Sequence, residues 1–206
     1  AGKVKMVKRP FDLRELVESA VAMLAVQAFR KGLELSVYID PTIPSQLTHD
    51  AVRIKQVLIN LIDNAIKFSP SGEIHIDVCT AQEDNNNLTV RFDIRDTGIG
   101  IAADQFKHLF KSFYQPNSGD AKRYQGTGLG LPICKRLVGQ LGGRITVDSI
   151  LGEGSVFSFT VVFPPPASLP EVEPFAGLGG KRCLIVGGSL SSKHIMIANK
   201  YLEHLA

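Results

Sequence analysis

The feature that most constrains the fold is an amphipathic helix predicted over residues 50–68. Asp50 is a suitable N-cap, and Pro70 and Gly72 end the helix. Its apolar residues recur every three or four positions and form one unbroken stripe of Ile54, Val57, Leu58, Leu61, Ile62, Ala65 and Ile66. Such a stripe must be buried, so other elements have to supply the opposite wall of a core.

Patterns on both sides of this helix supply that wall. A further helix is predicted from Phe11 to Arg30, where Gly32 ends it, and a short helix over residues 104–113. Alternating apolar residues predict strands over 33–39, 74–80, 88–95, 144–149 and 155–163. This order predicts an α+β fold, a two-layer α/β sandwich whose mixed sheet carries its helices on one face.

Proline-rich sequence divides the chain. Five prolines between residues 164 and 174 disfavour both helix and interior strand there, which predicts a linker. After the linker, an apolar run and a helical pattern predict one βα unit. We therefore expect an N-terminal tail over 1–9, a main domain over 10–164, the linker over 165–177 and the start of a second domain over 178–206.

Composition narrows the classes of function. The net charge is only +3 and no long basic run occurs, so nucleic-acid binding is not indicated. Cys79, Cys134 and Cys183 form no CxxC pair, which favours reduced thiols in a cytoplasmic protein. No apolar run reaches the roughly 20 residues that a membrane-spanning helix needs. We expect no direct membrane contact here, which leaves open a membrane anchor elsewhere in a longer parent protein.

Polar residues beside the apolar stripe suggest a site for metal and phosphate. Asn60, Asn64 and Lys67 share one side of the helix, because successive residues turn by about 100°. Asparagine is a poor helix former, whereas an amide oxygen can ligate Mg²⁺ and a lysine can contact phosphate. A solvated polar face is the alternative interpretation.

Two glycine motifs add chemistry suited to a nucleotide. Asp96-Thr97-Gly98-Ile99-Gly100 follows a strand, where a carboxylate can accept a hydrogen bond from an adenine amine and glycines let the backbone approach a ring. Gly126-Thr127-Gly128-Leu129-Gly130 opens a helix whose free N–H groups suit a phosphate. It is neither a Walker A nor a Rossmann motif. Taken singly, a capped turn and a hinge remain the alternatives.

The order of these motifs resembles the N, G1, F and G2 boxes of sensor histidine kinases. The series is an asparagine-bearing helix, Asp-x-Gly-x-Gly, the aromatic stretch Phe106–Phe113 and Gly-x-Gly-x-Gly. The resemblance runs from about Pro10 to Pro164. It implies the Bergerat (GHKL) fold of the HATPase_c family, which gyrase, Hsp90 and MutL ATPases share, and a catalytic domain that binds ATP with Mg²⁺.

Matching positions imply a role for each residue. Asn64 would ligate Mg²⁺, Asn60 and Lys67 would act at the metal or the phosphates, and these three form the expected catalytic set. Asp96 would accept from the adenine amine. The other expected nucleotide contacts are Phe68, Gly98, Gly100, Ile101, Phe110, Phe113, Lys122 and Arg123 on a lid over 116–125, Gly126, Thr127, Gly128, Leu129, Gly130 and Ser155.

The resemblance also implies a reaction and partners. The γ-phosphoryl group of ATP would pass to a histidine on a dimerisation domain outside this sequence, in a homodimeric parent. Related ATPases carry a glutamate where Asn60 stands, and a neutral amide cannot act as a general base, so little hydrolysis is expected. Residues 178–206 resemble the start of a receiver domain with Gly187 and Gly188 at its usual acidic positions, which implies a hybrid kinase with a degenerate receiver. That receiver or a separate response regulator would be a further partner.

Two other functions stay open. One is a non-catalytic pseudokinase module that binds a nucleotide or docks a partner, which intact Asn64 and Asp96 disfavour; the other is a hydrolysing GHKL ATPase, which Asn60 disfavours. Gln125 and His49 stand where glycine is frequent in the family, and we expect His49 to affect only a turn. None of the five histidines has the sequence context of a phosphoacceptor, so all are expected at the surface or partly buried.

Overall fold

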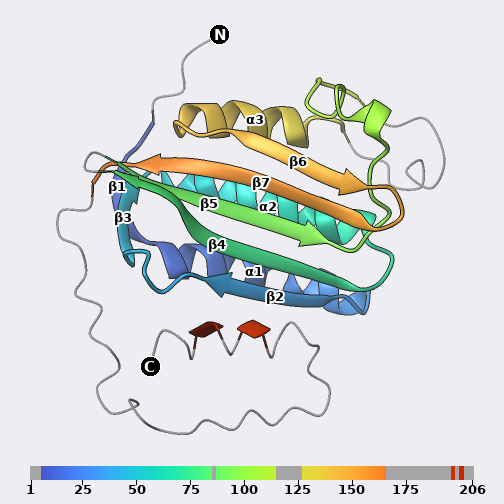
Figure 1. The fold of residues 1–206 in the computed structure, drawn as a ribbon, viewed down its shortest axis with the longest axis horizontal. Helices are drawn as coiled ribbons and strands as arrows, with labels where there is room; N and C mark the ends of the chain where they lie inside the picture. Colours follow the sequence, from blue (N-terminus) through green and yellow to red (C-terminus); the bar gives the residue numbers. More distant parts are fainter. Residues whose placement is uncertain (1–5, 85–86, 115–126, 166–195, 198–199, 202–206) are drawn as a thin grey trace, which may run out of the picture.

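The computed structural model describes residues 6–84, 87–114, 127–165, 196–197 and 200–201 (Figure 1). In chain order its elements are β1 (Arg9–Asp12), α1 (Leu13–Arg30), β2 (Glu34–Ile39), β3 (Gln46–His49), α2 (Ala51–Phe68), β4 (Glu73–Asp84), β5 (Asn87–Asp96), a 3-10 helix (Ala103–Gln105), α3 (Gly130–Gln140), β6 (Ile145–Ile150) and β7 (Gly154–Phe163). None of the helices in these ranges is long and apolar enough to cross a membrane.

A five-stranded mixed sheet forms one layer of the domain. Its strand order is β2-β4-β5-β7-β6. Strand β2 runs parallel to β4, and the other neighbouring pairs are antiparallel. Helices α1, α2 and α3 lie on the same face of this sheet (Figure 1). The predicted two-layer α+β sandwich is therefore confirmed.

Helix α2 lies at the centre of the core, as its apolar stripe predicts. Every residue of that stripe is at most 4% exposed and belongs to one core cluster with strand residues such as Ile76 and Phe92. Asp50 caps the helix, because its side chain accepts from the Arg53 N–H at 3.3 Å. Burial of each large side chain in the stripe contributes about 1.5–3 kcal/mol of stabilisation. The sum over the stripe fixes the rotation of α2 about its axis.

The prediction of a short helix over residues 104–113 is wrong. Only a 3-10 helix forms, and the turns after it close by bonds between neighbours three apart, such as Lys111 N–H to His108 O at 2.9 Å. Aromatic residues are mediocre helix formers. Phe113 then takes a φ of 62°, which no α-helix tolerates.

A small sheet of β1 and β3 is not evident from the sequence. Each strand has four residues, and Pro10 interrupts the first, so neither shows a strand pattern. His49 lies in β3 and is 3% exposed, so the expectation that it affects only a turn is wrong. His75 is also 3% exposed. These two histidines are core residues, contrary to the prediction for all five.

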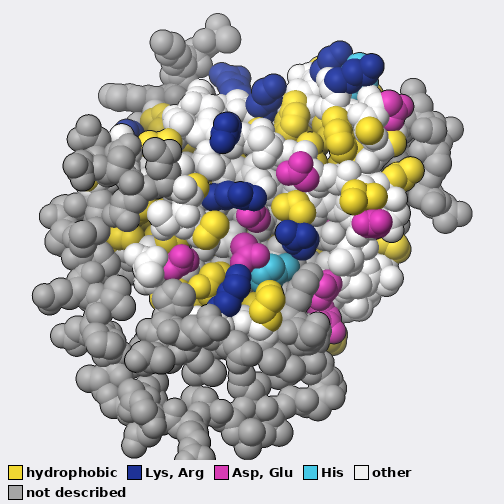
Figure 2. Space-filling view, in the orientation of Figure 1, with side chains coloured by type: hydrophobic (Ala, Val, Ile, Leu, Met, Phe, Trp, Pro, Cys, Tyr) yellow, Lys and Arg dark blue, Asp and Glu magenta, His cyan; other side chains and the backbone are white. Residues whose placement is uncertain are grey.

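On the face of the sheet opposite the helices, Figure 2 shows basic and acidic side chains intermixed with scattered hydrophobic ones. Arg91 Nε and Asp93 Oδ1, for example, lie 2.7 Å apart. Residues 196–197 and 200–201 are helical, and Tyr201 Oη accepts from the Ile39 N–H at 3.0 Å. The rest of the predicted βα unit over 178–206 lies outside the described residues.

Candidate functional site

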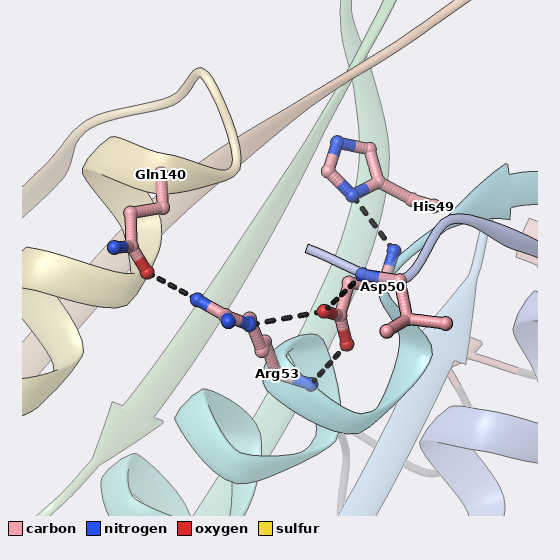
Figure 3. A network of polar contacts seen from close by, with 5 residues as sticks. His49, Asp50, Arg53 and Gln140 are labelled. Carbon is pink, nitrogen blue, oxygen red and sulfur yellow. Dashed lines mark hydrogen bonds and ion pairs between the residues drawn. The ribbon is translucent and has the colours of Figure 1, made fainter. Parts of the chain in front are cut away.

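A buried polar network fixes the start of α2 against the end of α3 (Figure 3). Arg53 Nε lies 2.9 Å from Asp50 Oδ2, and another guanidinium nitrogen of Arg53 donates to Gln140 Oε1. His49 Nδ1 accepts from the Asp50 N–H at 2.9 Å. His49, Asp50 and Arg53 are at most 8% exposed. Removing one partner would leave a buried charge unpaired, so the network holds these two helix ends together.

Helices α2 and α3 consequently run antiparallel. A second contact agrees with this direction, since Asn60, further along α2, is hydrogen-bonded to the thiol of Cys134, nearer the start of α3. Burial raises the pKa of Cys134 to about 11, and the bond from Asn60 opposes that rise. Asn64 lies one turn beyond Asn60 on α2 and is half-buried. The side of α2 that carries Asn60 therefore faces α3, the helix that begins at Gly130.

The C-terminal end of α2 carries the remaining predicted residues of this helix. Lys67 and Phe68 are both half-buried, and Lys67 Nζ lies 5.3 Å from the centroid of the Phe68 ring. That distance is within the range of a cation–π interaction. The Phe68 carbonyl accepts from the Ile99 N–H at 3.1 Å. This bond joins the helix to the loop that follows β5.

Asp96 lies at the end of β5, directly before that loop. It is 6% exposed, and its Oδ1 accepts from the Gly98 N–H at 2.9 Å. Burial raises the pKa of Asp96, while backbone N–H bonds from Gly98 and Ser155 favour the carboxylate and oppose the rise. A carboxylate with two oxygens has acceptor capacity beyond these bonds. Asp96 can therefore take a hydrogen bond from a ligand amine.

Close backbone approach explains the glycines of this loop. A Cβ atom at Gly98 would lie 2.4 Å from Phe68 O and 2.8 Å from both Asp96 Oδ1 and Ser69 Oγ. At Gly100, whose φ is +65°, it would lie 2.0 Å from Ile150 O. Any side chain at either position would collide with backbone. The loop is thus packed tightly between the end of α2 and the β6–β7 turn.

Sequence patterns missed three polar residues around this loop. Ser149 Oγ accepts from the Ile101 N–H at 2.9 Å and donates to Gly154 O at 2.7 Å. Thr97 Oγ1 accepts from the Glu73 N–H at 3.0 Å. Ser69 is fully buried, yet its hydroxyl has no hydrogen-bond partner among the described residues. Ser69 and Ser149 lie outside every motif found in the sequence. Thr97 lies inside the Asp96–Gly100 motif, but its contact with Glu73 is 24 residues away and no local pattern predicts it.

The aromatic stretch and the second glycine motif meet through the backbone. Phe113 N–H donates to Gly128 O at 3.0 Å, whereas the Phe113 ring is 75% exposed. Phe110 is half-buried, and Lys135 Nζ lies 5.5 Å from its ring centroid. Thr127 Oγ1 accepts from the Leu129 N–H at 3.4 Å.

The structure brings most of the predicted site residues together around α2, the start of α3 and the loop after β5. Ser155, paired with Asp96 across β5 and β7, is 7% exposed and contributes its backbone N–H to Asp96. Lys122, Arg123 and Gly126 lie outside the described residues, as does the lid predicted over 116–125.

Comparison with protein families identifies the chain. The family described as "Histidine kinase-, DNA gyrase B-, and HSP90-like ATPase" (HATPase_c) matches residues 49–166, more than half of the chain. The chain therefore belongs to the HATPase_c family, and its domain is homologous to the catalytic domains of sensor histidine kinases. The resemblance inferred from the four motifs is confirmed.

The curated relatives of the chain include sensor histidine kinases, one of which is named as a hybrid kinase. The chain is 40% identical over 171 residues to hybrid signal transduction histidine kinase B of Dictyostelium discoideum, covering 83% of this chain and 8% of that protein. It is 40% identical over 182 residues to sensor histidine kinase RcsC of Escherichia coli, covering 88% of this chain and 18% of that protein. It is 36% identical over 204 residues to sensor protein GacS of Pseudomonas syringae, covering 99% of this chain and 22% of that protein. The chain thus spans less than a quarter of each of these relatives.

Solved structures of histidine kinases have a fold similar to that of this chain. The chain matches full-length ShkA in complex with AMPPNP with a TM-score of 0.71 and 29% identity, covering 86% of this chain and 35% of that one. It matches the catalytic domain of histidine kinase ThkA with a TM-score of 0.60 and 26% identity, covering 76% of this chain and 98% of that one. The described domain therefore has the fold of a histidine kinase catalytic domain.

Proposed function

We propose that this chain is the ATP-binding catalytic domain of a hybrid sensor histidine kinase, which transfers the γ-phosphoryl group to a histidine on a dimerisation domain of the same homodimeric kinase. The observation that carries the proposal is Asp96, a buried carboxylate with spare acceptor capacity beside a loop that only glycines allow. Family membership and the AMPPNP complex of the related ShkA support it. We propose domains over 10–164, a linker over 165–177 and a receiver start over 178–206.

The residues present fit ATP. The unpartnered hydroxyl of Ser69 and the carboxylate of Asp96 both lie near Gly98, so a purine and ordered water can complete their hydrogen bonds. Asn64, half-buried on α2, offers an amide oxygen of the kind that Mg²⁺ takes. Bound Mg²⁺ would neutralise charge on the phosphates, and the first N–H groups of α3 would bind phosphate oxygens directly.

The proposed reaction is an in-line transfer. A ring nitrogen of the acceptor histidine bonds to the γ-phosphorus as the bond to the β,γ-bridging oxygen breaks, ADP leaves, and the histidine loses its N–H proton to solvent. In this proposal the domain acts by positioning ATP and neutralising its charge. Asn60 is a neutral amide, hydrogen-bonded to the Cys134 thiol, and cannot deprotonate water. Little steady ATP hydrolysis is therefore expected. A receiver domain or response regulator would accept the phosphoryl group next.

Calorimetric titration with Mg²⁺-ATP tests the proposal. Asp96→Asn replaces one acceptor oxygen by a donor that faces the adenine amine, so affinity should fall roughly 10- to 150-fold, the range for a hydrogen bond to a charged group. Asp148→Asn, an exposed carboxylate on β6, is the matched control and should bind like the wild type. Failure of the folded wild type to bind would favour the non-catalytic module.

A further inference from the structure

The ammonium group of Lys31 lies at the C-terminal end of α2, although Lys31 belongs to the end of α1. Its Nζ donates to the carbonyl oxygens of Ile66 at 2.6 Å, Lys67 at 3.1 Å and Ser69 at 3.4 Å. The last carbonyls of a helix lack partners within the helix and carry its negative partial charge. One cation from a neighbouring helix therefore closes the end of α2.

The remaining carbonyl at this helix end, that of Phe68, accepts a hydrogen bond from the loop that follows β5. Phe68 O accepts from the Ile99 N–H at 3.1 Å, between the carbonyls that Lys31 contacts. Carbonyls 66 to 69 are thus all bonded, three to the ammonium of Lys31 and one to the backbone of the loop after Asp96. The cation and the loop therefore bind carbonyls of the same helix end.

The position of Lys31 is itself well defined. Its backbone N–H donates to Ala28 O at 3.1 Å, Gly32 follows with a φ of +69°, and Leu33 N–H returns to Ala28 O at 3.0 Å. This is the usual closing arrangement of a helix end with glycine. Lys31 therefore extends from a fixed backbone toward α2, and its ammonium group reaches the last carbonyls of that helix.

We propose that Lys31 is a positioning residue for nucleotide binding. It fixes the end of α2 relative to the loop after β5, and so fixes the spacing between Asn64 and Lys67 on one side and Asp96 on the other. ATP must contact both groups at once, so a small shift of the helix end costs affinity. The inference rests on the proposed binding of ATP by these residues.

Three variants test this role. Lys31→Met keeps the aliphatic stem and removes the charge, Lys31→Arg keeps a cation at the helix end, and Arg30→Met removes the neighbouring exposed cation on α1 as a matched control. Mg²⁺-ATP affinity is measured by calorimetry at a temperature where every variant is folded. Amide hydrogen exchange at Ile99 reports the bond to Phe68 directly and needs no nucleotide.

We expect Lys31→Met to bind ATP roughly three- to tenfold more weakly and to exchange the Ile99 amide faster, because one charged contact to the helix end is lost. Lys31→Arg should recover most of the affinity, and Arg30→Met should match the wild type. Wild-type affinity and wild-type Ile99 exchange in Lys31→Met would overturn the inference, as would equal losses in Lys31→Met and Arg30→Met. A wild type that does not bind ATP would instead contradict the proposed function.

Discussion

Replacing Gly98 by alanine tests how tightly the loop after β5 is packed. The added Cβ would lie 2.4 Å from Phe68 O and 2.8 Å from Asp96 Oδ1. Both distances are shorter than a carbon and an oxygen can approach, and the first neighbour is backbone at the end of a helix. Gly98 does not have a positive φ, so the backbone itself accepts alanine and the effect is purely steric.

The expected cost follows from these contacts. Forcing one extra carbon into a packed site costs about 1–3 kcal/mol of unfolding free energy. Loss of glycine freedom in the unfolded chain returns only about 0.4–1 kcal/mol. We therefore expect net destabilisation, and ATP affinity about tenfold weaker or worse because Asp96 is displaced from its acceptor position. Urea denaturation and calorimetry measure the two effects.

Gly139→Ala is the matched control. Gly139 lies in α3, and a Cβ there would meet nothing within 4 Å. The substitution should stabilise the domain by up to about 1 kcal/mol through helix propensity and leave ATP affinity unchanged. If Gly98→Ala were as stable as the wild type and bound ATP equally well, the tight packing inferred for the loop would be refuted.

Two further predictions concern buried ionisable groups. Burial, and then the charge of Lys8, lowers the pKa of His49 in the folded state, so the neutral ring is favoured. The contribution of His49 to stability is full above the unfolded pKa of about 6.5 and is lost as pH falls through the lower folded pKa. Urea denaturation between about pH 7.5 and 5.5 should therefore show a steeper loss of unfolding free energy for the wild type than for His49→Gln. Equal slopes for the two proteins would contradict this. Because burial raises the pKa of Cys134 to about 11, iodoacetamide at about pH 8 should leave Cys134 unmodified in the native protein and modify it after unfolding, as read by peptide mass spectrometry. Rapid native labelling would show that the thiol is accessible.

Local periodicity predicted the framework of the fold well. The stripe on α2 and the alternating strands are repeated signals that one sequence window contains, and the structure confirms them. The helix over 104–113 failed because apolar spacing alone does not reveal turns closed by bonds to neighbours three residues away. Strands β1 and β3 were missed because four residues with a proline carry no pattern.

The candidate site was only partly accessible to sequence reasoning. Asp96 and the glycines can be recognised in the sequence, since a carboxylate and glycines after a strand form a short motif. Lys31, Ser69 and Ser149 do not, because their positions depend on contacts across the fold: Lys31 lies 35 residues from Ile66, and Ser149 lies 48 residues from Ile101. Long-range contacts of this kind are set by packing rather than by neighbouring residues.

The packed loop around Gly98 has a consequence for inhibitor discovery. Its shape is held by bonds from Ile99 to Phe68 and from Ile101 to Ser149 within the protein itself. A site that is ordered in advance costs a small ligand little conformational entropy on binding. We therefore expect amino-substituted heterocycles of fragment size to bind beside Asp96 without any phosphate group. A screen could begin with such uncharged compounds, which enter cells more readily than nucleotide analogues.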